Sequence, residues 1–196
     1  MPEDVRIFKE GIAPLAVARK LGSILFQFPA SFHCDDGTRD RLRELLGSFA
    51  DYSTAVELRH RSWDDNLDVL EEADSIPVFI DEPKFRDSTR QRPGSRRGIL
   101  YARFHGRQAE KWWHHEHRNE RYDYLYTEDE IRPHAELLRK VATEQVIEKA
   151  YIFFNNHPGA KAIVNAVMLR RELGVPVPEE LPATLKAIFP EYSSGF

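Results

Sequence analysis

The sequence contains a single cysteine, Cys34, among its 196 residues. One thiol cannot form an intramolecular disulfide, a redox pair or a thiolate cluster for zinc. No apolar run approaches the roughly 20 residues that cross a bilayer, and the opening residues lack the basic and then apolar pattern of a secretory signal. We therefore expect a cytoplasmic protein without a membrane partner.

The sequence also lacks a strong charge of either sign. Its formal net charge of -4 argues against a wholly basic nucleic-acid binder. A hydrophobic content of 41% is ordinary for a globular protein, and a chain of this length can bury one sizeable core. We expect a single domain over residues 1–196.

Short runs of strand-forming residues recur along the chain, and each ends on a polar or charged cluster. Apolar residues at helical spacing fill most of the stretches between them, and Ser62-Trp63-Asp64-Asp65 and Thr127-Glu128-Asp129-Glu130 read as helix starts. Strands that alternate with helices form a parallel sheet, and ligands bind outside the carboxyl ends of its strands. The expected strands are residues 24–27, 55–60, 78–81, 100–105 and 151–156.

Two α/β architectures fit this alternation, a doubly wound open sheet and a (β/α) barrel. The glycine-rich turn of a dinucleotide-binding sheet is absent. If Val56 and Leu58 pack on helices, Glu57 and Arg59 share the opposite strand face. A barrel lets such charges line its mouth, whereas an open sheet would bury them under helices. This favours a TIM-like barrel.

Four segments of the chain resemble the YecE-like family, which is catalogued as domain of unknown function 72. The resemblance covers nearly the whole chain and implies a TIM-like barrel with no established activity. Family members carry an additional opening segment, so the resemblance also implies a partial, N-terminally incomplete barrel of about five parallel strands, against the eight of a closed barrel. The matching segments are Ile24-Leu25-Phe26-Gln27-Phe28-Pro29, Val56-Glu57-Leu58-Arg59-His60-Arg61-Ser62-Trp63, Tyr101-Ala102-Arg103-Phe104-His105-Gly106-Arg107 and Phe154-Asn155-Asn156-His157.

The missing opening segment has three explanations: a truncated gene, a misassigned start, or a partial barrel that another chain completes. Open sheet edges expose unpaired backbone groups, so we also expect self-association through them.

The leading hypothesis for the site is a small anionic or phosphorylated ligand at the C-terminal mouth of the strands. TIM barrels often hold phosphate between the loops after the last two strands, here His105-Gly106-Arg107 and Asn155-Asn156-His157-Pro158-Gly159. The alternative is structural: Asn156 caps the following helix while Arg103 pairs with Glu57 or Asp81. The predicted ligand-binding residues are Gln27, Arg59, Arg103, Arg107, Asn155 and Asn156.

Acid and base chemistry is assigned to Glu57, Asp81 and His105, which lie at strand ends. The same carboxylates and histidine, with His33, suggest an alternative function, a metal-dependent phosphoesterase or nuclease-like protein acting on nucleic acid. Arg59 and Arg103 share those strand faces and disfavour a metal, so no metal ligand is predicted. The cofactor and enzymatic activity stay undecided, and a third alternative is an inactive truncated fragment.

A basic loop over residues 83–98 precedes the fourth expected strand, and an aromatic stretch with Trp112 and Trp113 follows that strand. Together they suggest binding of nucleic acid by charge and base stacking, which we rank below a small ligand because no named recognition motif is present. The loop's cations are Lys84, Arg86, Arg90, Arg92, Arg96 and Arg97.

Overall fold

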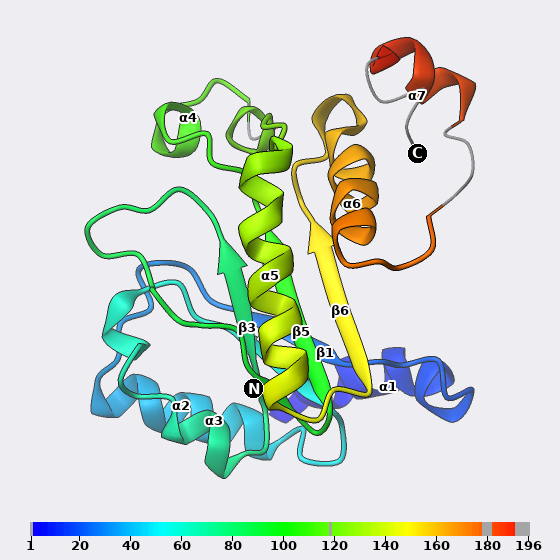
Figure 1. Ribbon diagram of the computed structural model, residues 1–196. Helices are drawn as coiled ribbons and strands as arrows, with labels where there is room; N and C mark the ends of the chain where they lie inside the picture. The colour runs from blue at the N-terminus through cyan, green and yellow to red at the C-terminus, as the bar shows by residue number, and fades with distance from the viewer. Residues whose placement is uncertain (1, 118, 178–181, 191–196) are drawn as a thin grey trace. The chain divides into compact units, whose positions relative to one another are not determined.

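The computed structural model describes residues 2–117, 119–177 and 182–190, and the chain divides into two compact units (Figure 1). The first unit comprises Met1–Val78 with Asp87–Arg90, and the second comprises Phe79–Arg86 with Gln91–Phe196. Strand β3 (Ile76–Asp81) contributes its first half to one unit and its second half to the other.

The first unit is a parallel sheet with helices packed on one face. Strand β1 pairs with β2, and β2 pairs with the start of β3, both in parallel. Val56 and Leu58 pack with Leu42 and Leu46 of α2 and with Leu70 of α3. This confirms the predicted alternation. The elements are α1 (Pro2–Val17), β1 (Ile24–Gln27), α2 (Asp36–Gly47), β2 (Thr54–Glu57), the 3-10 helix η1 (Arg61–Trp63) and α3 (Asp68–Glu72).

The helix predicted to begin at Ser62 is wrong. The backbone N–H of Ser62 donates to Nδ1 of His60, which caps the short turn η1 instead. The carbonyl of Ser62 accepts from the side-chain amide of Asn66 rather than from a helical backbone. A side chain that competes for backbone groups in this way ends a helix early, and α3 begins only at Asp68.

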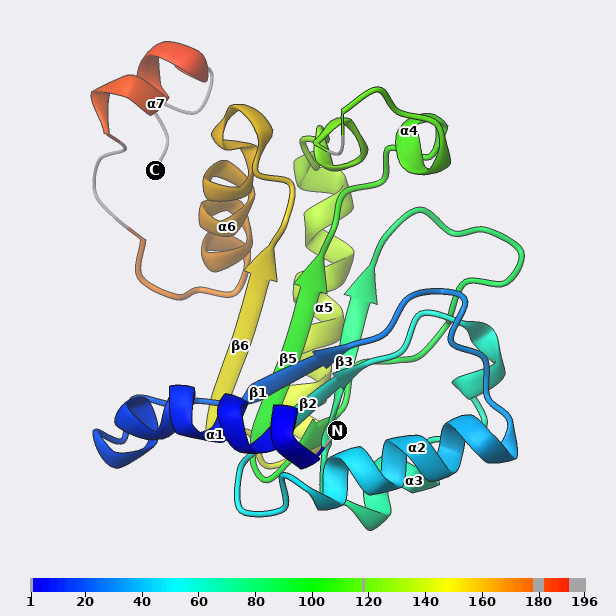
Figure 2. The same cartoon turned by 180° about the vertical axis from the view of Figure 1, so that it is seen from behind.

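The second unit contains β3, β5 and β6 running in the same direction, with α5 and α6 on one face (Figures 1 and 2). The basic loop is not wholly irregular, because the two-residue strand β4 pairs antiparallel with β5. The elements are β4 (Ser95–Arg96), β5 (Ile99–Phe104), α4 (Glu110–Trp113), η2 (Glu120–Tyr122), α5 (Glu128–Glu144), β6 (Lys149–Phe154), η3 (Pro158–Ala160), α6 (Lys161–Glu172) and α7 (Ala183–Ile188).

Helix α5 begins where the sequence predicts, because Thr127 and Glu130 form a reciprocal capping box. The core beneath it joins Leu100, Ala102 and Phe104 of β5 to apolar residues of α5 and α6. Since side chains alternate along a strand, Tyr101 and Arg103 lie on the face of β5 turned away from those helices.

That second face carries aromatic and polar side chains at paired positions of β5 and β6. The register places Tyr101 beside Tyr151 and Arg103 beside Phe153. The ring of Tyr101 stacks on Phe153 with 5.3 Å between centroids. Figure 2 views this side of the two strands, with α5 behind them.

The fold is α/β, a partial TIM-like (β/α) barrel, as the sequence predicts. That residues 1–196 form a single domain stays a prediction. Within the described ranges, no helix is both long and apolar enough to cross a membrane.

Candidate functional site

A buried ion pair joins the end of β3 to the loop after β5. Asp81 is 5% exposed, and its two carboxylate oxygens accept from Nε and Nη2 of Arg107, each at 2.9 Å. The hydroxyl of Tyr126 donates to Oδ2 of Asp81 at 2.7 Å and accepts from the backbone N–H of Gly106 at 2.9 Å. Asp81 therefore turns toward the side of the sheet that α5 covers.

The surroundings of Asp81 fix its charge. Burial alone would raise its pKa, but hydrogen bonds from His134, Arg107 and Tyr126 outweigh burial and hold the pKa well below the usual range for Asp. The same pair raises the pKa of Arg107, and burial together with Asp81 raises the pKa of Tyr126. Asp81 is thus a stable carboxylate at neutral pH and a weak base.

Arg107 extends the network to α5. Its Nη2 also lies 2.9 Å from Nε2 of His134, and its Nη1 lies 3.3 Å from Oε1 of Glu130. Nε2 of His134 lies 3.4 Å from Oδ1 of Asp81 as well, so the ring contacts both members of the ion pair. Glu130 also accepts from the hydroxyl of Tyr124, whose pKa burial and Glu130 raise to about 12. Arg107 therefore stabilises the loop after β5 through hydrogen bonds to side chains of β3 and α5.

The loops after β5 and β6 meet at a fully buried histidine. His105 has no exposed surface, and Nδ2 of Asn155 donates to its Nδ1 at 3.1 Å. An amide nitrogen cannot accept, so Nδ1 of His105 is the acceptor, and in the neutral form of the ring the proton lies on Nε2. The adjacent Gly106 has a φ of +84°, and a Cβ there would lie 2.8 Å from Cβ of Tyr124. Only glycine fits this position.

Asn156 is fully buried and has a fixed orientation. Asn165 accepts from the N–H of Tyr126 and donates to its carbonyl, so Oδ1 of Asn165 is an acceptor. Nδ2 of Asn156 donates to that oxygen at 2.7 Å and to the carbonyl of Tyr124 at 2.8 Å. Its Oδ1 is buried without a hydrogen-bond partner among the described residues. A buried acceptor without a donor costs about 1–3 kcal/mol.

Asn156 does not cap α6, so that part of the structural alternative is wrong. The residue before the helix is Ala160, which is left-handed with a φ of 61° and makes no side-chain cap. Gly159 is also left-handed. The first N–H groups of α6 therefore lack a side-chain cap in this loop.

The predicted residues of the first unit form a separate group. Glu57 is fully buried and accepts from Nε of Arg59 at 2.7 Å. Gln27 is exposed and lies beside Glu57 in the register of β1 and β2. The ring centroids of His33 and His60 lie 3.9 Å apart with the planes tilted by 30°. Burial, followed by the His33 charge, lowers the pKa of His60.

The structure thus pairs Glu57 with Arg59, Asp81 with Arg107, and His105 with Asn155. Their catalytic and ligand-binding roles stay predictions. In the part of the chain that the structure describes, no group of His, Cys, Asp and Glu side chains is arranged to hold a metal ion.

Sequence reasoning missed Tyr126, His134 and Asn165. The last two are buried polar residues on the apolar faces of α5 and α6. A polar residue at a core position of an amphipathic helix is a usable signal, because burial requires it to find a partner.

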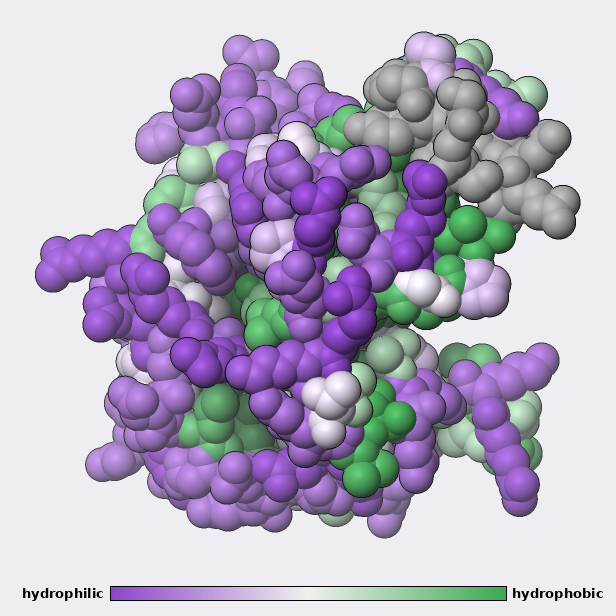
Figure 3. All heavy atoms as spheres, viewed as in Figure 1, coloured by the Kyte–Doolittle hydropathy of each residue, from purple (hydrophilic) through white to green (hydrophobic). Residues whose placement is uncertain are grey.

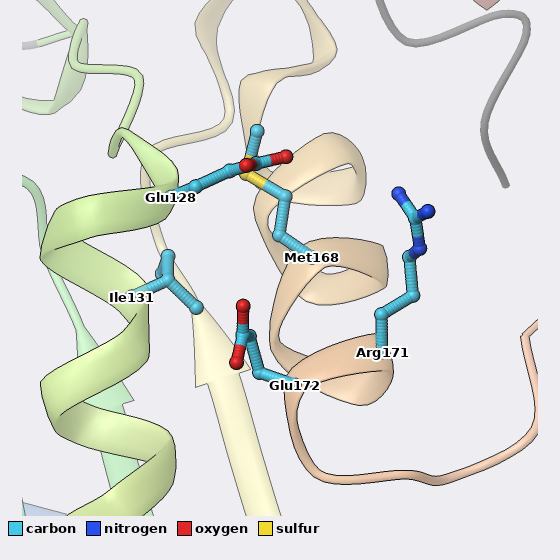
Figure 4. Close-up of a pocket in the computed structure, with 5 residues that line it drawn as sticks. All are labelled: Glu128, Ile131, Met168, Arg171 and Glu172. Atoms are coloured by element: carbon cyan, nitrogen blue, oxygen red, sulfur yellow. The ribbon is translucent and has the colours of Figure 1, made fainter.

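A different cavity, of about 270 Å³, lies between α5 and α6 (Figure 4). None of the predicted site residues lines it. Its walls are Glu128, Ile131, Met168, Arg171 and Glu172.

A sequence model described as "Protein of unknown function DUF72" matches residues 2–186. The chain belongs to this family. The resemblance seen in its four segments is confirmed. The Bacillus subtilis (strain 168) relative named UPF0759 protein YunF is 28% identical over an alignment that covers 86% of this chain.

Solved DUF72 family proteins have the same fold. One from Thermotoga maritima MSB8 is 35% identical, with a TM-score of 0.80 over 88% of this chain and 65% of its own. Another, from Enterococcus faecalis V583, is 27% identical, with a TM-score of 0.79 over 92% of this chain and 70% of its own. The chain spans 63% of the length of YunF.

Proposed function

We propose that this DUF72 protein binds a small anionic, phosphorylated ligand beyond the C-terminal ends of β5 and β6. The observation that carries the proposal is the contact between His105 and Asn155 from the two neighbouring loops, with the buried Asn156 next in the chain. Two of these side chains have no exposed surface. Polar groups buried at strand ends of an α/β fold are typical of binding sites.

Arg103 supplies the positive charge in this proposal. It lies on the same face of β5 as His105, two residues before it, and beside Phe153 of β6. A guanidinium binds phosphate oxygens through paired hydrogen bonds. Arg107 is proposed in a supporting role, since its guanidinium contacts Asp81, Glu130 and His134 and so holds the loop after β5.

Asn156 indicates which chemical group the ligand carries besides its negative charge. Its unpartnered Oδ1 needs a donor, which a hydroxyl of a phosphorylated polyol or of the phosphate itself would supply. An acid role for His105, at the end of β5, belongs to the same proposal. Ligand contacts for Gln27 and Arg59 and base chemistry for Glu57 are proposed separately, within the first unit. A cytoplasmic location is proposed as well.

The test is thermal unfolding with added phosphate or sulfate. We expect both ions to raise the melting temperature, because a ligand at 100 times its Kd stabilises by about 2.7 kcal/mol. Arg103→Ala should abolish the rise. The matched control is Arg92→Ala, which removes the same charge from an exposed position in the basic loop. An Arg103 variant that responds like the wild type contradicts the proposal.

A metal-dependent phosphoesterase is the competing function, and an inactive fragment is another. No arrangement of the described residues favours the metal. Thermal unfolding with added Mn²⁺ or Zn²⁺, run in parallel with phosphate and sulfate, distinguishes these functions. Stabilisation by the metal alone supports the phosphoesterase. No stabilisation by metal or by anion supports the inactive fragment.

A further inference from the structure

Strand β6 is built differently from its neighbour β5. Leu100, Ala102 and Phe104 of β5 are buried, whereas every described residue of β6 is exposed or half-buried. Phe153 of β6 is 44% exposed. The only charge in the strand is Lys149 at its start. An apolar edge with no charged residue beyond its first position is prone to pair with another strand.

Among the residues that the structure describes, the outer edge of β6 presents unpaired backbone groups at alternate positions. The N–H groups of Lys149 and Asn155 donate to carbonyls before and within β5. Because backbone groups alternate along a strand, Ala150, Ile152 and Phe154 turn theirs to the other side. Within the described ranges, β6 pairs with β5 alone.

An apolar groove of about 350 Å³ runs along this edge on the side of α6. Figure 3 shows apolar surface over the lower part of β6 and over the segment after α6. The groove is lined by Ala150, Ile152, Phe154, Ala166, Leu169, Arg170, Leu173 and Val175.

We infer that β6 pairs antiparallel with β6 of a second copy of this chain, about a twofold axis at Ile152. In this register the residues with outward-facing backbone groups pair with each other. Ile152 lies opposite Ile152 of the second copy, and Phe154 lies opposite its Ala150. On the other face Tyr151 lies opposite Phe153, which forms an aromatic pair across the strands.

The strand is complementary to itself in this register. The large Phe154 ring meets the small Ala150, where the groove has room. Lys149 lies opposite Asn155, so like charges do not face each other. A twofold axis makes both contacts occur twice, and both grooves are covered in one closed dimer.

Charge substitution at the aromatic pair tests the inference on the full chain. The double variant Tyr151→Lys with Phe153→Lys places like charges opposite each other across the axis, and so does Tyr151→Glu with Phe153→Glu. We expect the wild type to sediment as a dimer, each double variant alone as a monomer, and their equimolar mixture as a heterodimer. Val146→Lys, outside the paired segment, should leave the dimer intact.

Circular dichroism checks that the double variants keep their fold. If they unfold, Ala150→Arg fills the groove from an exposed position and should also give a monomer. A wild type that is monomeric over a wide range of concentration overturns the inference. So does a mixture of Lys and Glu variants that stays monomeric while both are folded, or a dimer that persists in the Lys variant alone.

Discussion

Arg107 holds Asp81 through two parallel hydrogen bonds of 2.9 Å, from Nε to Oδ2 and from Nη2 to Oδ1. This two-bond geometry fixes both the loop after β5 and the end of β3. The pair is buried on the Asp81 side and one-third exposed on the Arg107 side.

Asp81→Asn should strongly destabilise the protein. The substitution removes the charge partner of Arg107 and one acceptor of the Tyr126 hydroxyl, and breaking a buried pair costs about 3–5 kcal/mol. Urea unfolding measures the loss. Asp129→Asn is the control, since its pair with Arg132 lies at the surface and should change stability by less than about 1 kcal/mol. Equal losses in the two variants would contradict this role for Asp81.

Acid should weaken the wild type through the same carboxylate. The pKa of Asp81 is lower in the folded chain than in the unfolded chain, so the unfolded chain takes up the proton first as pH falls. The stabilisation is therefore complete above the unfolded pKa of about 3.9 and is lost below it. Unfolding free energies from pH 7 to pH 3 should fall at the acid end, and the fall should be shallower in Asp81→Asn.

Gly106→Ala should destabilise by roughly 1–3 kcal/mol, because the position combines a left-handed backbone with close approach of Tyr124. Gly47→Ala, at the end of α2, meets nothing within 4 Å and should be neutral or stabilising. Melting temperatures of the two variants give the comparison. If the variants melted together, the contact with Tyr124 would not be a tight one.

The His105 ring should carry its proton on Nε2 when neutral, and the nitrogen chemical shifts of the imidazole report this directly. Asn155→Asp replaces the donor with a carboxylate, which accepts from Nδ1–H and should move the proton to Nδ1. Unchanged shifts in the variant would mean that Asn155 does not set the tautomer.

Binding to nucleic acid should be weak and without sequence preference. A protein that neutralises several phosphates loses affinity with salt at a log-log slope of about -0.9 per contact on duplex DNA. Mobility-shift titrations at increasing salt measure this slope. Submicromolar binding that disappears when Arg90, Arg92, Arg96 and Arg97 are neutralised would reverse our ranking of ligands.

The sequence predicted the strands and their faces well, because strand periodicity is local. Val56 and Leu58 meet the helices, and Glu57 and Arg59 meet each other, as alternation requires. The capping box at Thr127 is equally local and was confirmed. The helix at Ser62 failed because His60, outside the predicted motif, takes the backbone N–H of Ser62.

The partners of Asp81 could not be predicted from sequence. Tyr126 lies 45 residues away along the chain and donates to Asp81 across the fold. Strand alternation places Asp81 on a face but does not say what covers that face. Loop geometry decides which arginine, among Arg59, Arg103 and Arg107, pairs with a given carboxylate. In the structure Arg107 forms the ion pair with Asp81.

The two-way link between Asn165 and the backbone of Tyr126 joins an irregular segment to the middle of α6. The amide hydrogen of Tyr126 is therefore held in a buried side-chain bond, although its residue belongs to no helix or strand. Its exchange with solvent deuterium requires α6 to separate from that segment. Tyr126 should exchange as slowly as the central amides of β5, which makes it a reporter for the opening of the second unit.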